Sequence, residues 1–71
     1  MGWTWKYLRL DETEIDAPPA SAVVTAFPTQ ADAESWLGEA YATLLNDGVD
    51  HVVLFEGERK VYGPMSLHPT T

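Results

Sequence analysis

Apolar residues with a helical period occupy the middle of the chain. They recur every three or four residues and form one continuous stripe on a helix, at Ala33, Trp36, Leu37, Ala40, Tyr41, Leu44 and Leu45. Thr29 is suited to cap the N-terminus, with Asp32 three residues further on as its partner. Gly48 is suited to the left-handed conformation that ends helices. The pattern predicts a helix over about residues 30–46.

Bulky and polar residues alternate near the start of the chain. Trp3, Trp5 and Tyr7 share one side of an extended backbone, which is typical of a strand. We expect this strand over about residues 3–10. An acidic loop with a proline pair should follow over residues 11–22, because adjacent prolines continue neither a ladder nor a helix.

Two later stretches are also typical of strands. Residues 23–27 contain β-branched side chains and are compatible with a short second strand. His51 to Phe55 is almost entirely apolar, and a turn at Gly57 followed by Lys60-Val61-Tyr62 predicts a hairpin over about residues 51–63. Residues 68–71 are expected to form a loose tail.

These elements predict an α+β fold in one domain over residues 1–71. The expected architecture is a small antiparallel sheet of three to four strands with one α-helix packed on one face, in the order β(β)αββ. A chain of 71 residues has room for one hydrophobic core only. It has no cysteine, so its core must be stable without disulfides or thiolate metal sites.

The net charge of −7 narrows the classes of partner. It disfavours direct binding of nucleic acid and of anionic membranes, and it favours a basic protein partner. No stretch approaches the roughly 20 apolar residues of a membrane span. The first ten residues are unlike a signal peptide, and the absence of cysteine fits a reducing compartment. We therefore expect a cytoplasmic protein.

Candidate chemistry is sparse in this sequence. The two histidines, His51 and His68, lie far apart along the chain, and no nucleophile, metal or phosphate motif has the required spacing. The sequence therefore predicts no catalytic residues, no metal ligands and no cofactor. We expect a protein that is not an enzyme.

Trp3, Trp5 and Tyr7 allow two interpretations. Facing solvent, they would form an aromatic stripe suited to a partner or ligand. Facing the helix, they would pack on residues such as Trp36 and supply the core that a small domain needs. The burial preference of aromatic residues favours the second interpretation for at least two of the three.

The predicted helix carries acidic residues and no Lys or Arg. Glu34, Gly38, Glu39 and Asp47 form the candidate protein-interaction surface. Ordinary solvated helices interleave charges of both signs, and a glycine inside a helix costs about 1 kcal/mol relative to alanine. The competing interpretation is a general acidic bias of the sequence and a tolerated glycine.

Part of the chain resembles a family of small actinobacterial proteins of unknown function. The resemblance covers roughly the C-terminal two thirds and depends on Phe27-Pro28-Thr29-Gln30, Ala33 to Gly38, Gly48-Val49-Asp50 and Val61 to Leu67. It implies no activity or site. A second pattern is similar to half of the SPOR domain, which binds peptidoglycan, but that domain repeats the unit and this chain has room for one.

The sequence favours a protein-interaction module that binds an unknown and possibly basic protein. The acidic helix or an exposed sheet edge would form the contact, and pairing of edge strands would also give a homodimer. One alternative is an acidic nucleic-acid mimic that inhibits a DNA- or RNA-binding protein. Another is a small ligand-binding protein or enzyme.

Overall fold

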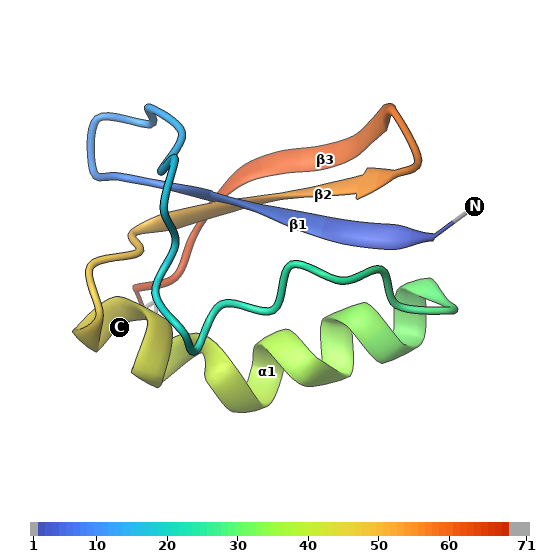
Figure 1. The fold of residues 1–71 in the computed structure, drawn as a ribbon, viewed down its shortest axis with the longest axis horizontal. Helices are drawn as coiled ribbons and strands as arrows, with labels where there is room; N and C mark the ends of the chain where they lie inside the picture. The colour runs from blue at the N-terminus through green and yellow to red at the C-terminus, as the bar shows by residue number, and fades with distance from the viewer. Residues whose placement is uncertain (1, 69–71) are drawn as a thin grey trace.

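One helix lies beneath one face of a three-stranded sheet in the computed structural model, which describes residues 2–68 (Figure 1). The elements are β1 (Trp3–Leu8), α1 (Gln30–Asn46), β2 (His51–Glu56) and β3 (Arg59–Ser66). β2 is the central strand and pairs antiparallel with both neighbours. The predicted α+β class and the order β-α-β-β are confirmed.

Helix α1 begins and ends where its apolar period predicts. The Oγ1 atom of Thr29 accepts a hydrogen bond from the Asp32 N–H at 3.1 Å, which closes the first turn as a capping residue should. Gly48 adopts a positive φ of 100° just after the helix. Ala33, Leu37 and Leu44 are buried along the stripe. These contacts fix the helix face that meets the sheet.

The aromatic residues of β1 fill the space between sheet and helix. Trp5 and Tyr7 are only 4% and 3% exposed. Trp5 Nε1 donates to the Ala33 carbonyl at 3.1 Å, and the Tyr7 hydroxyl donates to the Val23 carbonyl. Each buried ring therefore has a partner for its polar atom, as buried tryptophan and tyrosine require.

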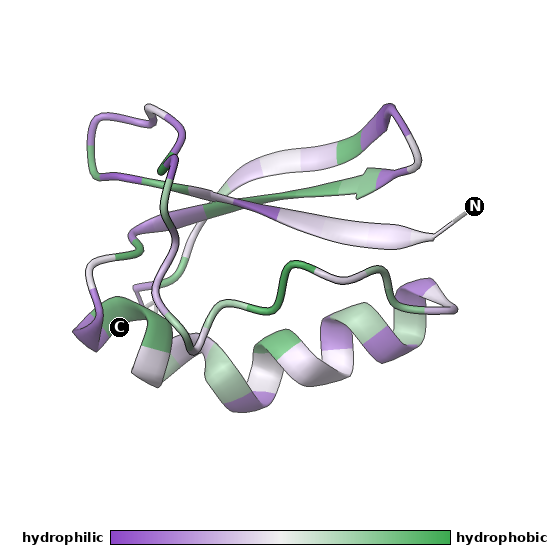
Figure 2. Ribbon diagram, viewed as in Figure 1, coloured by the Kyte–Doolittle hydropathy of each residue, from purple (hydrophilic) through white to green (hydrophobic). Residues whose placement is uncertain are grey.

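β2 supplies the apolar centre of the sheet (Figure 2). Val52 and Leu54 are fully buried among the core residues. Leu67 folds back after β3 and is also buried, held by a hydrogen bond from its N–H to the Asp50 carbonyl at 2.9 Å. The core is thus one layer of side chains between sheet and helix.

The first half of the chain differs from the prediction at two places. β1 ends at Leu8, because Arg9 already bonds across a turn from its N–H to the Thr13 carbonyl. The stretch 23–27 is not a strand. Only Phe27 pairs, in an isolated bridge with Trp3, so β-branched composition alone was a misleading signal there.

The hairpin is longer than the sequence predicts. β3 does not stop at Gly63-Pro64 but continues to Ser66, with an irregular register that absorbs the proline. β3 lies at an edge of the sheet, as a strand containing proline should. Of the predicted tail 68–71, His68 is held by Asp50, and residues 69–71 lie outside the described residues.

Candidate interaction site

The aromatic residues of β1 do not form a solvent-facing stripe. Trp5 and Tyr7 are buried against α1, and Trp3 is half-buried against the same core. Tyr7 meets the ring of Trp36 edge-on, with centroids 6.4 Å apart. A binding role for Trp3, Trp5 and Tyr7 as an exposed stripe is therefore wrong, since the core uses these side chains.

The acidic residues of α1 do not form one surface either. Glu34 and Gly38 line a groove beside β3, whereas Glu39 is exposed outside it. Asp47 lies at the end of the helix, where its Oδ2 accepts a hydrogen bond from Ser21 Oγ at 2.6 Å. The structure therefore brings together two of the four predicted interaction residues and separates the other two.

The groove lies between α1 and the free side of β3, and we call it the α1–β3 groove. Its volume is about 510 Å³ and it is broadly open to solvent. The helix contributes Glu34, Leu37, Gly38 and Tyr41, and the strand contributes Tyr62 and Met65. The floor is apolar, and the segment that follows β3 closes one end through Leu67 and His68.

A carboxylate stands at the side of this groove. Glu34 Oε2 accepts hydrogen bonds from Gln30 Nε2 at 2.7 Å and from the Tyr62 hydroxyl at 3.3 Å. Burial and then the nearby Glu34 charge raise the pKa of Tyr62, so its hydroxyl stays protonated as a donor. The contact joins helix to strand and leaves an exposed negative charge at the groove.

Asp50 organises the opposite end of the groove. This nearly buried carboxylate lies 2.5 Å from His68 Nε2 through Oδ1 and 3.7 Å from His51 Nδ1 through Oδ2. No sequence pattern predicts this cluster, because 18 residues separate Asp50 from His68 and no motif links them. Residues 2–68 hold no group of three side chains suited to a metal ion. The contact thus anchors the segment after β3.

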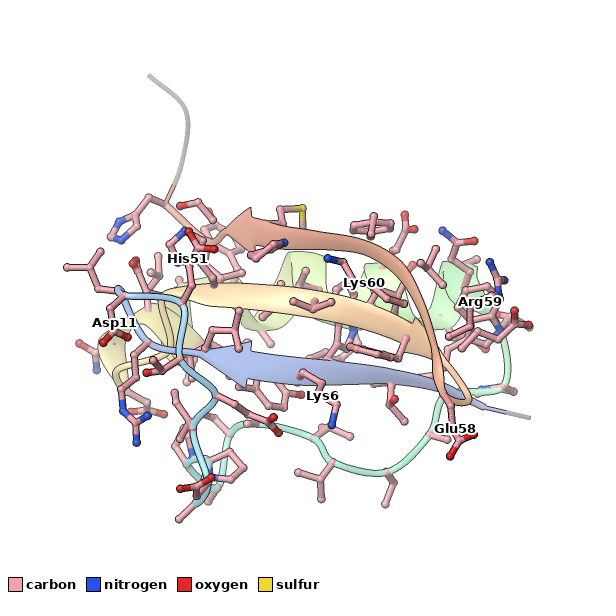
Figure 3. The ribbon with its side chains drawn as sticks, turned by 90° about the horizontal axis from the view of Figure 1, so that it is seen from above. Lys6, Asp11, His51, Glu58, Arg59 and Lys60 are labelled. Atoms are coloured by element: carbon pink, nitrogen blue, oxygen red, sulfur yellow. The ribbon has the colours of Figure 1, made fainter. Side chains whose placement is uncertain are left out.

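Charge is distributed unevenly between the two layers. α1 has no Lys or Arg, while Lys6 and Lys60 lie on the sheet face that α1 does not cover (Figure 3). The Lys6 ammonium is 3.6 Å from Glu14 and 5.5 Å from the centroid of the Phe55 ring. The helix side, which includes the groove, therefore carries acidic residues without a Lys or Arg on α1 to offset them.

None of the family models, curated proteins or solved structures compared with this chain matches it. The resemblance to small actinobacterial proteins stays a prediction. Among the described residues, no helix has the length and the apolar character to cross a membrane. Any functional conclusion must therefore come from the geometry of the groove and its charges.

Proposed function

We propose that this protein is a non-enzymatic interaction module that binds a basic, extended peptide segment of a partner protein. The α1–β3 groove is the docking surface. The observation that carries the proposal is the combination found there: an apolar floor, a strand edge that no strand within residues 2–68 pairs with, and the Glu34 carboxylate.

Exposed apolar side chains stand on both sides of the groove. Tyr41 of α1 is 39% exposed and Met65 of β3 is 36% exposed, although both are large. Tyrosine gives a rigid apolar surface with a polar tip, and methionine adapts to irregular partners. These two side chains are suited to hold apolar residues of a peptide.

The strand edge supplies the second kind of contact. β3 pairs with β2 on one side, and no strand within residues 2–68 pairs with its other side. An extended peptide can add to such an edge through backbone hydrogen bonds. Pro64 has no N–H, so an added strand would pair on the hairpin side of Pro64. The docked segment is therefore short.

The charge of the groove determines which kind of peptide it can bind. The protein carries a net charge of −7, and the groove is lined by Glu34 with no Lys or Arg beside it. A peptide with Lys or Arg next to apolar residues complements this surface. Such an interaction should weaken as salt increases, because the charges are exposed.

The alternative functions have less support from the structure. A nucleic-acid mimic requires carboxylates spaced along one ribbon, yet Asp47 lies at the C-terminal end of α1 and Glu58 in the β2–β3 turn, at opposite ends of the molecule (Figure 1). A homodimer formed by pairing two β3 edges would use the same edge as the peptide. The setting we propose is the cytoplasm, because the chain contains no cysteine.

A displayed library of random peptides tests the proposal. Selected peptides should combine basic and apolar residues, bind more weakly at high salt, and shift the NMR signals of Gly38 and Met65. Enrichment of acidic peptides, or shifts confined to other surfaces, would contradict the proposal. A sedimentation measurement across protein concentrations distinguishes peptide binding from self-association through β3.

Matched variants on one helix locate the site. Glu34→Gln should weaken the selected peptides, whereas Glu39→Gln removes the same charge outside the groove and should leave their affinity almost unchanged. Both side chains are exposed on α1, and the amide oxygen of glutamine at position 34 can still accept from the Tyr62 hydroxyl, so neither change should disturb the fold. Equal losses for both variants would mean that net charge, and not the groove, controls binding.

A further inference from the structure

The outer edge of β1 is closed at both ends by the chain's own loop. Phe27 and Trp3 exchange two backbone hydrogen bonds, at 2.9 and 2.7 Å. At the other end, Glu14 bridges to Leu8. Five residue steps separate Trp3 from Leu8, which corresponds to about 17 Å of extended strand.

Between these bridges, Trp5 directs two backbone groups away from β2. Alternate residues of an antiparallel strand turn their N–H and C=O to the same side. Trp3 bonds outward to Phe27, and the Tyr7 carbonyl accepts the Ile15 N–H at 2.9 Å, so Trp5 also faces outward. Neither its N–H nor its C=O has a partner among residues 2–68.

The lack of a protein partner for these groups makes the arrangement unusual. Trp5 is almost fully buried, and buried backbone groups in proteins nearly always have hydrogen-bond partners. The sequence explains why the loop supplies none. After Ile15 the chain approaches Pro18, which has no N–H, and the residue before a proline has a restricted backbone. The loop therefore leaves the edge before it reaches Trp5.

The unpartnered groups open into a cavity, which we call the β1 slot. Its volume is about 310 Å³. β1 forms one wall through Thr4 to Tyr7, and the loop forms the other through Glu14, Ile15, Asp16, Pro18 and Val24. Figure 3 shows this loop running alongside β1 on the side of Lys6. The β1 slot is thus a half-open space whose β1 wall offers the Trp5 N–H and C=O and also the outward-facing Tyr7 N–H, which has no partner among residues 2–68.

We propose that the β1 slot binds a primary carboxamide group. The carbonyl of such a group accepts from the Trp5 N–H, while its N–H donates to the Trp5 carbonyl. An added β-strand would offer the same pair of bonds, but the two bridges block a chain running along this edge. A group of side-chain size that enters across the edge meets no such obstacle. Asn or Gln side chains and free amides share this chemistry.

An NMR titration of the full chain with acetamide tests the proposal. The backbone amide signals of Trp5 and Tyr7 should shift and saturate, with weak affinity because the probe is small. N,N-dimethylacetamide keeps the acceptor but has no N–H donor, so it should produce no saturable shift. The absence of a saturable shift at Trp5 with acetamide, or equal shifts with both probes, would overturn the proposal.

Two capped residues distinguish the source of the group. N-acetylglutamine N-methylamide should bind more tightly than acetamide if a protein side chain is the natural occupant, and less tightly if a free amide is. N-acetylglycine N-methylamide offers backbone groups only and should not bind. Binding of the glycine compound at Trp5 would show that the slot accepts a strand, contrary to the proposal.

Substitutions at exposed positions locate the binding. Val24 lines the slot and is 67% exposed, so Val24→Trp should block the acetamide shifts. Leu10 is 77% exposed and lies outside the slot, so Leu10→Trp is the matched control. Hydrogen exchange of the unmodified protein provides a second readout: acetamide should slow exchange of the Trp5 amide, and dimethylacetamide should not. An unchanged rate with acetamide would count against the proposal.

Discussion

The edge of β1 is bridged by the chain's own loop at Trp3 and at Leu8, whereas the edge of β3 has no neighbouring segment within the described residues. Both edges expose the same kind of backbone groups, but they carry different side chains. β1 presents its aromatic rings to the core, and β3 presents half-exposed residues beside the groove. The side chains of β1 therefore contribute mainly to the core, whereas those of β3 are available to the peptide of the proposed function.

Shortening an aromatic side chain of β1 should have the largest effect. Trp5→Ala removes a buried ring and its hydrogen bond to Ala33, so we expect the free energy of unfolding to fall by about 3–5 kcal/mol. Met65→Ala in β3 should cost less than about 1 kcal/mol, because that side chain is partly exposed. Urea unfolding followed by circular dichroism measures both. Similar costs would remove the distinction between the two strands.

The attachment of β3 to β2 is tested at Gly63. This residue has a φ of 120°, and an added Cβ would lie 2.9 Å from the Val52 carbonyl oxygen and 3.0 Å from the Val53 Cα. Gly63→Ala should therefore destabilise the protein by about 2 kcal/mol or more. Thermal unfolding gives the size of the effect. An unchanged midpoint would mean that β3 shifts its register without cost.

Removal of the buried Tyr7 hydroxyl of β1 should have a smaller effect on the free energy of unfolding. Tyr7→Phe removes the hydrogen bond to the Val23 carbonyl and should cost about 1 kcal/mol at neutral pH. Burial raises the pKa of Tyr7 above its ordinary value near 10. The contribution of the neutral phenol is thus complete below pH 10 and declines as the pH rises beyond it.

Unfolding at increasing pH measures this contribution. Above pH 10 the unmodified protein should lose free energy of unfolding more steeply than the Tyr7→Phe variant. Tyr62→Phe in β3 is the control and should change the profile less, because Tyr62 is more exposed than Tyr7. Parallel profiles for the unmodified protein and Tyr7→Phe would contradict the shifted pKa.

Gly38→Ala should also have a small effect on stability, with the opposite sign. An added Cβ meets no atom within 4 Å, so the helix should gain about 1 kcal/mol. The same methyl group projects into the α1–β3 groove and should weaken the selected peptides. A variant that is more stable and binds less well would show that the glycine serves recognition. Unchanged peptide affinity would contradict the use of the groove.

Local signals in the sequence were sufficient for the helix and for the presence of the hairpin, but not for the end of β3 at Ser66. The period of α1, its cap at Thr29 and the glycine after it all act within a few residues, so the predicted bounds match the structure. The strand predicted over residues 23–27 was wrong because strand formation depends on a pairing partner, and only Phe27 has one. Non-local pairing, rather than composition, decided the outcome there.

Only some of the residues that line the α1–β3 groove could be predicted from the sequence. The sequence places Glu34 and Gly38 on a helix without basic residues, but their neighbours Tyr62 and Met65 come from a strand more than twenty residues away. Asp50 and His68 meet only because the chain folds back after β3. No spacing along the chain encodes such contacts, so they become visible only with the coordinates.

The separation of lysines on the sheet from carboxylates on the helix also has a kinetic consequence. A basic molecule that approaches α1 meets carboxylates with no Lys or Arg on that helix, whereas on the opposite face Lys6 and Lys60 weaken the attraction of nearby acids such as Glu14. Encounters would be oriented before any contact forms, which raises association rates most at low ionic strength. The charge asymmetry would then govern how quickly a partner arrives, and the groove how long it stays.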